Sequence, residues 1–181
     1  MNICAAARIS LVILCCLCGL GTARAQATWV SEAKLGVLDH DIKIGGDHAE
    51  PGVDVNGEVL FVAPGFLRAV GAPRPHFGGS VNTAGATSYA YTGLTWTASL
   101  VGPVYGALGL GGAIHDGQLD EPVPQRKLFG SRVLFHEYVE LGFRVLPAVS
   151  LSAFLDHMSN ADLARHNAGL TNLGMRTGFS F

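Results

Sequence analysis

Residues 170–181 read Leu-Thr-Asn-Leu-Gly-Met-Arg-Thr-Gly-Phe-Ser-Phe. Alternate positions in this stretch form a mostly apolar row: Leu173, Met175, Thr177, Phe179 and Phe181. A period of two is typical of a half-buried β-strand. Shortly before it stands His157-Met158-Ser159-Asn160, which places a base and a hydroxyl two positions apart. The end of the chain therefore combines a strand signal with a chemical one.

The start of the chain predicts a targeting segment. Arg8 is followed by the short apolar run Ile9 to Leu20, and Ala23-Arg24-Ala25 fits a small-residue cleavage site. We therefore expect a signal peptide at residues 1–25 and a single domain at residues 26–181. All four cysteines lie before residue 26, so the processed chain would contain neither a thiol nor a disulfide.

The composition favours a membrane protein without spanning helices. Hydrophobic residues make up 49% of the chain, and the mean hydropathy is +0.33. No run after residue 25 approaches the ~18 apolar residues that a spanning helix needs. Lipid-facing residues interleaved with polar or small ones are typical of a transmembrane barrel. Without Arg8 and Arg24 the net charge is about −4, and we expect no nucleic-acid partner.

Eight segments of about ten alternating residues indicate an all-β fold, an eight-stranded antiparallel transmembrane β-barrel. The expected strands are Trp29 to Leu38, which is weak, Val53 to Ala63, Pro75 to Asn82, Ser88 to Leu100, Val104 to Ile114, Ser131 to Val145, Val149 to Asn160, and Leu170 to Phe181. Glycines inside strands (Gly106, Gly109, Gly111, Gly112) would mark close packing in a narrow barrel.

Loop lengths indicate an orientation. Residues 101–103 and 146–148 are short, proline-bearing turns, whereas residues 115–130 form a long polar loop. Bacterial barrels keep short turns on the periplasmic side and long loops outside. The strand from Val149 to Asn160 would then run outward and place His157 and Ser159 at the level of the outer leaflet. The connection over residues 64–74 is longer than this pattern expects.

His157 and Ser159 share the odd positions of their strand with Val149, Leu151, Ala153 and Leu155. Both are therefore expected to face lipid and not the lumen. A hydroxyl beside an imidazole suggests an activated serine, with the histidine as general base and then general acid. The alternative is that two polar residues lie in the wet interfacial zone where the strand ends.

The stretch resembles the C-terminal motif of the PagL-type lipid A 3-O-deacylases, eight-stranded outer-membrane serine hydrolases. In that family a His-x-Ser-Asn run is followed by Asn-x-Gly and then a carboxylate, and His157, Ser159, Asn160, Asn167 and Gly169 match. The resemblance implies that His157 and Ser159 are catalytic. It also implies that the Asn160 side chain and an N–H group around Asn167 bind the oxyanion. Asn167 and Gly169 equally suit a turn that needs positive φ.

One position departs from the family motif. Thr171 stands where the family has the carboxylate that orients the histidine. A threonine accepts a hydrogen bond from an imidazole but cannot neutralise an imidazolium. Loss of the triad acid costs roughly four orders of magnitude in other serine hydrolases. Either activity is impaired or another acid has taken this role.

Glu137 is the candidate acid. A three-residue turn at 146–148 would pair Val145 with Val149 and therefore Glu137 with His157, with apolar pairs between. A two-residue turn would place Tyr138 opposite His157 and is disfavoured. The alternative is an interfacial glutamate balanced by Arg132 or solvent. Asp162 and His166 are other loop candidates, whereas Asp156 points inward.

The resemblance implies an enzyme that removes the 3-O-linked 3-hydroxyacyl chain from lipid A of lipopolysaccharide, without cofactor or metal. We expect a location in the Gram-negative outer membrane and, since Phe181 matches an assembly signal, the barrel assembly machinery as a partner. The alternatives are a degenerate, non-catalytic structural or adhesive barrel and a different esterase or phospholipase. Asp39-His40-Asp41 and His115-Asp116 look like metal ligands, but without a complete ligand set we expect solvated loops.

Overall fold

The structure, a computed structural model, describes residues 29–42 and 50–181. The expected signal peptide lies outside the described residues. Eight strands and one short 3₁₀ helix follow each other along the chain: β1 (Val30–Asp39), β2 (Val53–Phe61), η1 (Gly65–Val70), β3 (Arg74–Asn82), β4 (Tyr89–Ser99), β5 (Val104–His115), β6 (Val133–Leu146), β7 (Val149–Ser159) and β8 (Leu170–Ser180). Each strand begins and ends within two residues of its predicted bounds.

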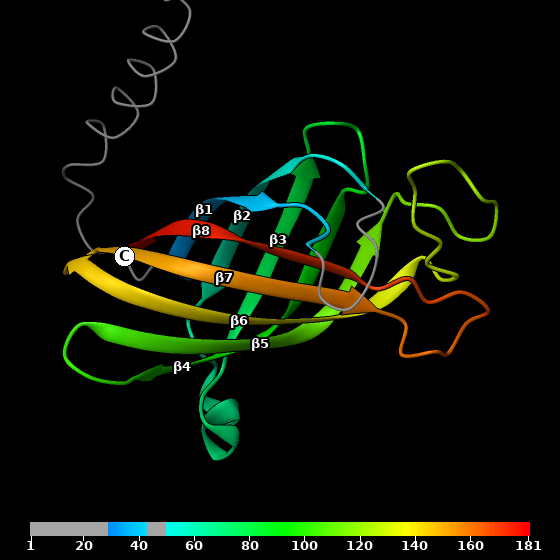
Figure 1. Cartoon of the computed structure of the whole chain (residues 1–181). Coiled ribbons are helices and arrows are strands. Elements are labelled where there is room, and N and C mark those ends of the chain that lie inside the picture. The colour runs from blue at the N-terminus through cyan, green and yellow to red at the C-terminus, as the bar shows by residue number, and fades with distance from the viewer. Residues whose placement is uncertain (1–28, 43–49) are drawn as a thin grey trace, which may run out of the picture.

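The strands form one closed barrel in which each strand pairs with its sequence neighbours and β8 returns to β1 (Figure 1). All pairings are antiparallel. Closure leaves no unpaired strand edge, as a sheet in lipid requires. No helix in the described residues has the length and apolar character to cross a membrane.

The alternation of side chains separates an apolar outer wall from a polar lumen. Val55, Leu141 and Met175 are among the exposed apolar residues of the wall, while Asp54, Asn56 and Glu58 on β2 are buried inside. The lumen is crossed by ion pairs. Lys34 lies 2.7 Å from Glu140, and Arg176 pairs with Glu140 and Glu58. Because these charges are buried, each depends on its partner for stability.

Some of the strand glycines provide room for large side chains in this narrow lumen. A Cβ at Gly109 would overlap the Tyr138 ring, and a Cβ at Gly111 would meet the backbone of Thr92. Close packing is therefore confirmed at these two positions. The prediction of close packing is wrong at Gly106 and Gly112. Both lie on the outward row of β5, and an added Cβ there would make only ordinary contacts at 3.5 Å or more.

The β6–β7 turn differs from the prediction. Pro147 and Ala148 form a two-residue connection in which Leu146 opposes Val149, so the expected Val145–Val149 pair is wrong. The register shifts between Arg144 and Leu146, and this bulge adds one residue to β6. Beyond the bulge, Glu137 opposes His157 and Val139 opposes Leu155, as predicted.

Candidate active site

His157 and Ser159 lie on the outer wall near the end of β7. Odd residues of β7 are partly or fully exposed, whereas Asp156 and Met158 are buried in the lumen. The predicted outward orientation is therefore confirmed. Residues two apart on a strand rise about 3.3 Å each, so the two Cα atoms are roughly 7 Å apart on one face. Their side chains can reach one another over this distance.

His157 is held by Thr171 of β8. Its Nδ1 lies 2.7 Å from Thr171 Oγ1, and the two residues are direct cross-strand partners. In the tautomer that a general base requires, Nδ1–H donates to Thr171 Oγ1, and Nε2 is left with its lone pair. Thr171, at the position of the family carboxylate, therefore still contacts the histidine in this chain, but through a neutral hydroxyl.

Gly169 determines where the other side of the imidazole lies. A Cβ on Gly169 would stand 2.6 Å from Cε1 and 3.0 Å from Nε2 of His157. Continuing the β7–β8 register by two residues beyond the His157–Thr171 pair sets Ser159 beside Gly169. Nε2 therefore points toward the end of the strand that carries Ser159. Gly169 does not have the positive φ that we expected. The reason for a glycine at this position is instead steric, because a side chain would collide with the imidazole of His157.

Glu137 flanks His157 on the other side, from β6. Both line an open groove of about 320 Å³ on the outer wall, together with Leu108, Val139 and Leu155. In the described residues, the hydrogen-bond partner of His157 is Thr171 and not Glu137. Arg132 does not balance Glu137 either, since its guanidinium donates to the carbonyls of His115 and Gly117.

The loop after β7 is organised by two asparagines. The backbone N–H of Asn160 donates to Asn167 Oδ1 at 2.8 Å, and Asn167 Nδ2 donates to Asp162 at 3.0 Å. Positive φ angles occur at Ala161 and Asp162, so the expected positive-φ turn at Asn167 and Gly169 is wrong. The Asn160 side chain turns inward, and its Nδ2 donates to the carbonyls of Phe129 and His166 at 2.7 and 2.6 Å.

The other candidate acids differ in their surroundings. Asp156 faces the lumen as predicted, where the Tyr89 hydroxyl donates to it at 2.5 Å. Asp162 is exposed and accepts the hydrogen bond from Asn167, and His166 is half-buried in the same loop. None of these three has a hydrogen bond with His157 in the described part of the chain.

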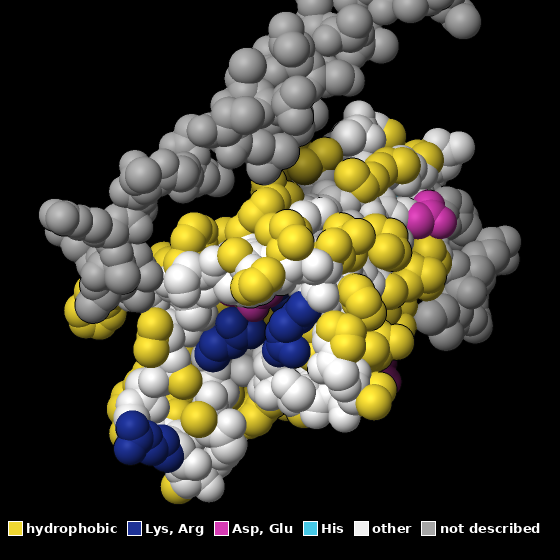
Figure 2. Space-filling model, turned by 90° about the vertical axis from the view of Figure 1, so that its left-hand side faces the viewer, with side chains coloured by type: hydrophobic (Ala, Val, Ile, Leu, Met, Phe, Trp, Pro, Cys, Tyr) yellow, Lys and Arg dark blue, Asp and Glu magenta, His cyan; other side chains and the backbone are white. Residues whose placement is uncertain are grey.

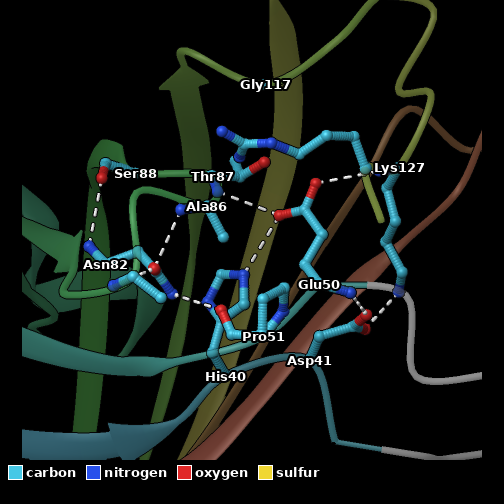
Figure 3. A network of polar contacts seen from close by, with 12 residues as sticks. His40, Asp41, Glu50, Pro51, Asn82, Ala86, Thr87, Ser88, Gly117 and Lys127 are labelled. Atoms are coloured by element: carbon cyan, nitrogen blue, oxygen red, sulfur yellow. Dashed lines mark hydrogen bonds and ion pairs between the residues drawn. The ribbon is translucent and has the colours of Figure 1, made fainter. Parts of the chain in front are cut away.

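The prediction of solvated loops is wrong for His40, Asp41 and His115, all of which are buried. His40 bridges Asp54 and Glu50 at the end of β1 (Figure 3). Burial alone would lower the pKa of His40, but its hydrogen bonds to these carboxylates outweigh burial and raise the pKa to about 9. Burial likewise opposes ionisation of Glu50, yet the His40 bond and two backbone N–H donors lower the pKa of Glu50 to about 2. The attraction between the His40 imidazolium and these two buried carboxylates explains why the residues at the end of β1 are buried.

This network reaches the candidate site through Lys127, a residue that sequence reasoning missed. Lys127 Nζ pairs with Asp41 (Figure 3). It also donates to the carbonyl of Gly169 at 2.6 Å. Its backbone N–H donates to Glu50 at 2.9 Å. Lys127 therefore connects the loop after β1 to the glycine that contacts His157. No pattern in the sequence signals this pairing, since Lys127 lies inside a polar loop.

The described residues contain no group of three or more His, Cys, Asp or Glu side chains arranged to hold a metal ion. The imidazoles of His40 and His115 are each engaged with groups of the protein. The arrangement at His157 and Ser159 instead provides a base, a hydroxyl and a lipid-facing groove.

Comparison with known proteins adds the family. A family model described as lipid A 3-O-deacylase (PagL) matches residues 67–180. The fold is similar to the crystal structure of the outer membrane enzyme PagL, with a TM-score of 0.57 and 14% identity over 84% of this chain and 99% of that chain. It is also similar to Neisserial surface protein A (NspA), with a TM-score of 0.53 and 12% identity over 84% and 96%.

No curated protein matches the chain with significance. At these identities the solved structures establish the fold, a small barrel of the kind found in bacterial outer membranes. The family model covers more than half of the chain, including the whole of β7 and the loop that follows it. The chain belongs to the lipid A 3-O-deacylase (PagL) family.

Proposed function

We propose that the protein is an outer-membrane serine hydrolase that removes the 3-O-linked 3-hydroxyacyl chain from lipid A. The observation that carries this proposal is the outward His157, which contacts Thr171 through Nδ1 and directs Nε2 toward the level of Ser159. Membership of the family supplies the substrate class.

The reaction proceeds in two half-reactions. Ser159 Oγ attacks the ester carbonyl carbon while His157 Nε2 takes the hydroxyl proton. The tetrahedral intermediate collapses, and His157 returns that proton to the departing 3-oxygen of the sugar. Water then attacks the acyl-serine while His157 takes its proton, and His157 returns this proton to Ser159 Oγ as the 3-hydroxy fatty acid is released. Each half-reaction makes one bond to the carbonyl carbon and breaks one, so neither a metal nor a redox group is needed.

Two residues support the imidazolium that forms in each step. Thr171 fixes the ring orientation and the tautomer, because its oxygen accepts from Nδ1. Glu137 supplies the negative charge that threonine lacks, from the neighbouring strand and at the same level. In this arrangement the orienting and the charge-neutralising tasks of a triad acid are divided between two side chains.

The oxyanion donors belong to the loop after β7. Asn160 acts in this proposal as a positioning residue, since its side-chain N–H groups donate to Phe129 and His166. The half-buried Asn167 is the stronger direct donor, because its Nδ2 has a second N–H beyond the one donated to Asp162. Donors held before the reaction stabilise developing charge without reorganisation.

The location of the site suits the substrate. The long loops mark the extracellular end of the barrel, and His157 lies near that end of β7. Lipid A occupies the outer leaflet, and its 3-O-ester lies just below the headgroup. The apolar groove at Leu108, Val139 and Leu155 continues from His157 toward the membrane interior and fits an acyl chain.

The test is mass spectrometry of lipid A from cells that carry the protein, its Ser159→Ala variant, or no protein. We expect one 3-hydroxyacyl chain to be lost only with the unaltered protein and with Ser99→Ala, a matched change at the opposite end of the barrel. An unchanged lipid A profile would support the non-catalytic barrel, which the replacement at Thr171 favours. Release of fatty acid from glycerophospholipid would indicate a different esterase.

A further inference from the structure

The connection between β2 and β3 is unusual for its end of the barrel. It lies at the end where Pro147 and Ala148 suffice to join β6 to β7, yet it spans residues 62–73 and contains η1. Gly71 closes η1 in a left-handed conformation with φ of 90°, and Ala72 donates its backbone N–H to the Leu67 carbonyl at 2.9 Å. The segment is therefore a defined turn of helix.

This segment folds back along the outer wall. The indole Nε1 of Trp96 donates to the carbonyl of Val70 at 2.8 Å, and Gly71 lies under the same ring. Trp96 faces outward on β4, three residues before the strand ends at Ser99, which is roughly 10 Å along the strand. In Figure 1, η1 is the helix that projects below the barrel. The helix thus lies at the depth of the membrane boundary.

The outward side chains of this segment are apolar and uncovered. Phe66 is 83% exposed, and Val62 and Val70 are 56% and 57% exposed. No residue of η1 is buried, and one basic residue, Arg68, stands in its last turn. Figure 2 looks onto this end of the barrel and shows a projection at its lower edge where a basic side chain lies beside hydrophobic ones. Such exposure is unfavourable in water.

We propose that η1 is an interfacial anchor that inserts Phe66 and Val70 into the phospholipid of the periplasmic leaflet. The apolar surface of η1 is continuous with the lipid-facing wall through Trp96, which stands where aromatic belts occur. Arg68 would lie at the level of anionic headgroups, which attract basic side chains. A second copy of the chain is the poorer occupant, because six residues fall far short of the roughly 800 Å² per partner of a stable interface.

The test uses a single environment-sensitive label. Residues 26–181 contain no cysteine, so Phe66→Cys gives the processed protein one labelling position at an exposed side chain. The labelled protein is placed in vesicles of phosphatidylethanolamine and phosphatidylglycerol. Leu141→Cys on the exposed wall provides the lipid control, and Glu121→Cys on a long loop provides the water control. The unsubstituted protein measures background labelling.

We expect iodide to quench the label at position 66 several-fold less than at position 121. Lipids with a spin label near the headgroup should quench it more than lipids labelled deep in the chain. Iodide quenching equal to that at position 121 would overturn the proposal, as would protection from both iodide and lipid quenchers, which would mean cover by protein. A second arm adds Arg68→Glu to the labelled protein. This change should weaken quenching by headgroup-labelled lipid only when phosphatidylglycerol is present. The same weakening in vesicles without phosphatidylglycerol would refute the role of Arg68.

Discussion

Replacing Glu137 by glutamine tests whether the charge needed at His157 comes from β6. The substitution keeps the size of the side chain and its hydrogen-bonding capacity but removes its negative charge. Glu137 has no hydrogen bond or ion pair that depends on this charge in the described residues, so the barrel should fold normally. Any change in rate then reports on charge beside the imidazolium.

The expected magnitude follows from the cross-strand pairing of Glu137 with His157. Opposed residues have Cβ atoms about 4.5–5.5 Å apart, and we take about 5 Å between the two charges. With an effective dielectric constant of about 20, the attraction is roughly 3 kcal/mol. A loss of that size in the transition state lowers kcat on the order of 10²-fold. This is less than the roughly 10⁴-fold cost of removing a directly bonded triad acid.

The assay is the rate of 3-hydroxy fatty acid release from lipid A in mixed micelles, with Glu121→Gln as the same change in an exposed loop. A loss of less than about threefold in Glu137→Gln would remove Glu137 from the mechanism, since it corresponds to under 1 kcal/mol. Adding Thr171→Glu to Glu137→Gln should restore activity, because Thr171 already contacts Nδ1. No recovery would show that the site depends on the position of the acid as well as on its charge.

Three further predictions concern other parts of the molecule. Gly169→Ala would force the His157 ring aside, because the new Cβ would stand 2.6 Å from Cε1. A displacement near 1 Å lowers kcat about 10²-fold, while the mobility of the folded barrel on a gel should not change. Glu140→Gln removes the carboxylate shared by the buried Lys34 and Arg176 and leaves each with one more distant partner, Glu32 or Glu58. Unfolding in urea should show a loss of about 3 kcal/mol, absent in Glu121→Gln. The pKa of His40, raised to about 9, and that of Glu50, lowered to about 2, predict that their ion pair stabilises most between pH 4.5 and 6.5. The stability difference between the unaltered protein and His40→Gln should fall as pH rises through 9 and as it falls through 2, and a flat difference would contradict the ion pair.

Alternation in the sequence was sufficient for the strands and for the side on which each residue lies. It placed His157 and Ser159 outside and Asp156 inside, because the period of two is a property of the strand itself. The Glu137–His157 pair was also predicted, but through a three-residue turn that does not occur. A two-residue turn and a bulge at Val145 restore the same register. Turn length alone therefore does not determine register where a strand can take up an extra residue.

Partners across the lumen and between loops could not be predicted. Lys34 and Glu140 are 106 residues apart and Lys127 and Asp41 are 86 apart, and alternation carries no information about which polar residues meet. The same limit explains the error at His40, Asp41 and His115. Their polarity and the lack of a complete ligand set suggested solvent exposure. In the structure, carboxylates compensate the burial of His40, Lys127 that of Asp41, and backbone groups that of His115.

The geometry of a closed antiparallel barrel gives the proposed base two positions from which an acid could face it. His157 on β7 has two cross-strand neighbours at the same level, Thr171 on β8 and Glu137 on β6. Both lie on the outward row, so a carboxylate at either position faces the imidazole from one side. The hydroxyl of Thr171 keeps a hydrogen-bond acceptor for the imidazole, and in the proposed mechanism the charge of Glu137 on β6 completes the site. The departure at Thr171 is therefore compatible with a working hydrolase, provided that Glu137 remains opposite His157.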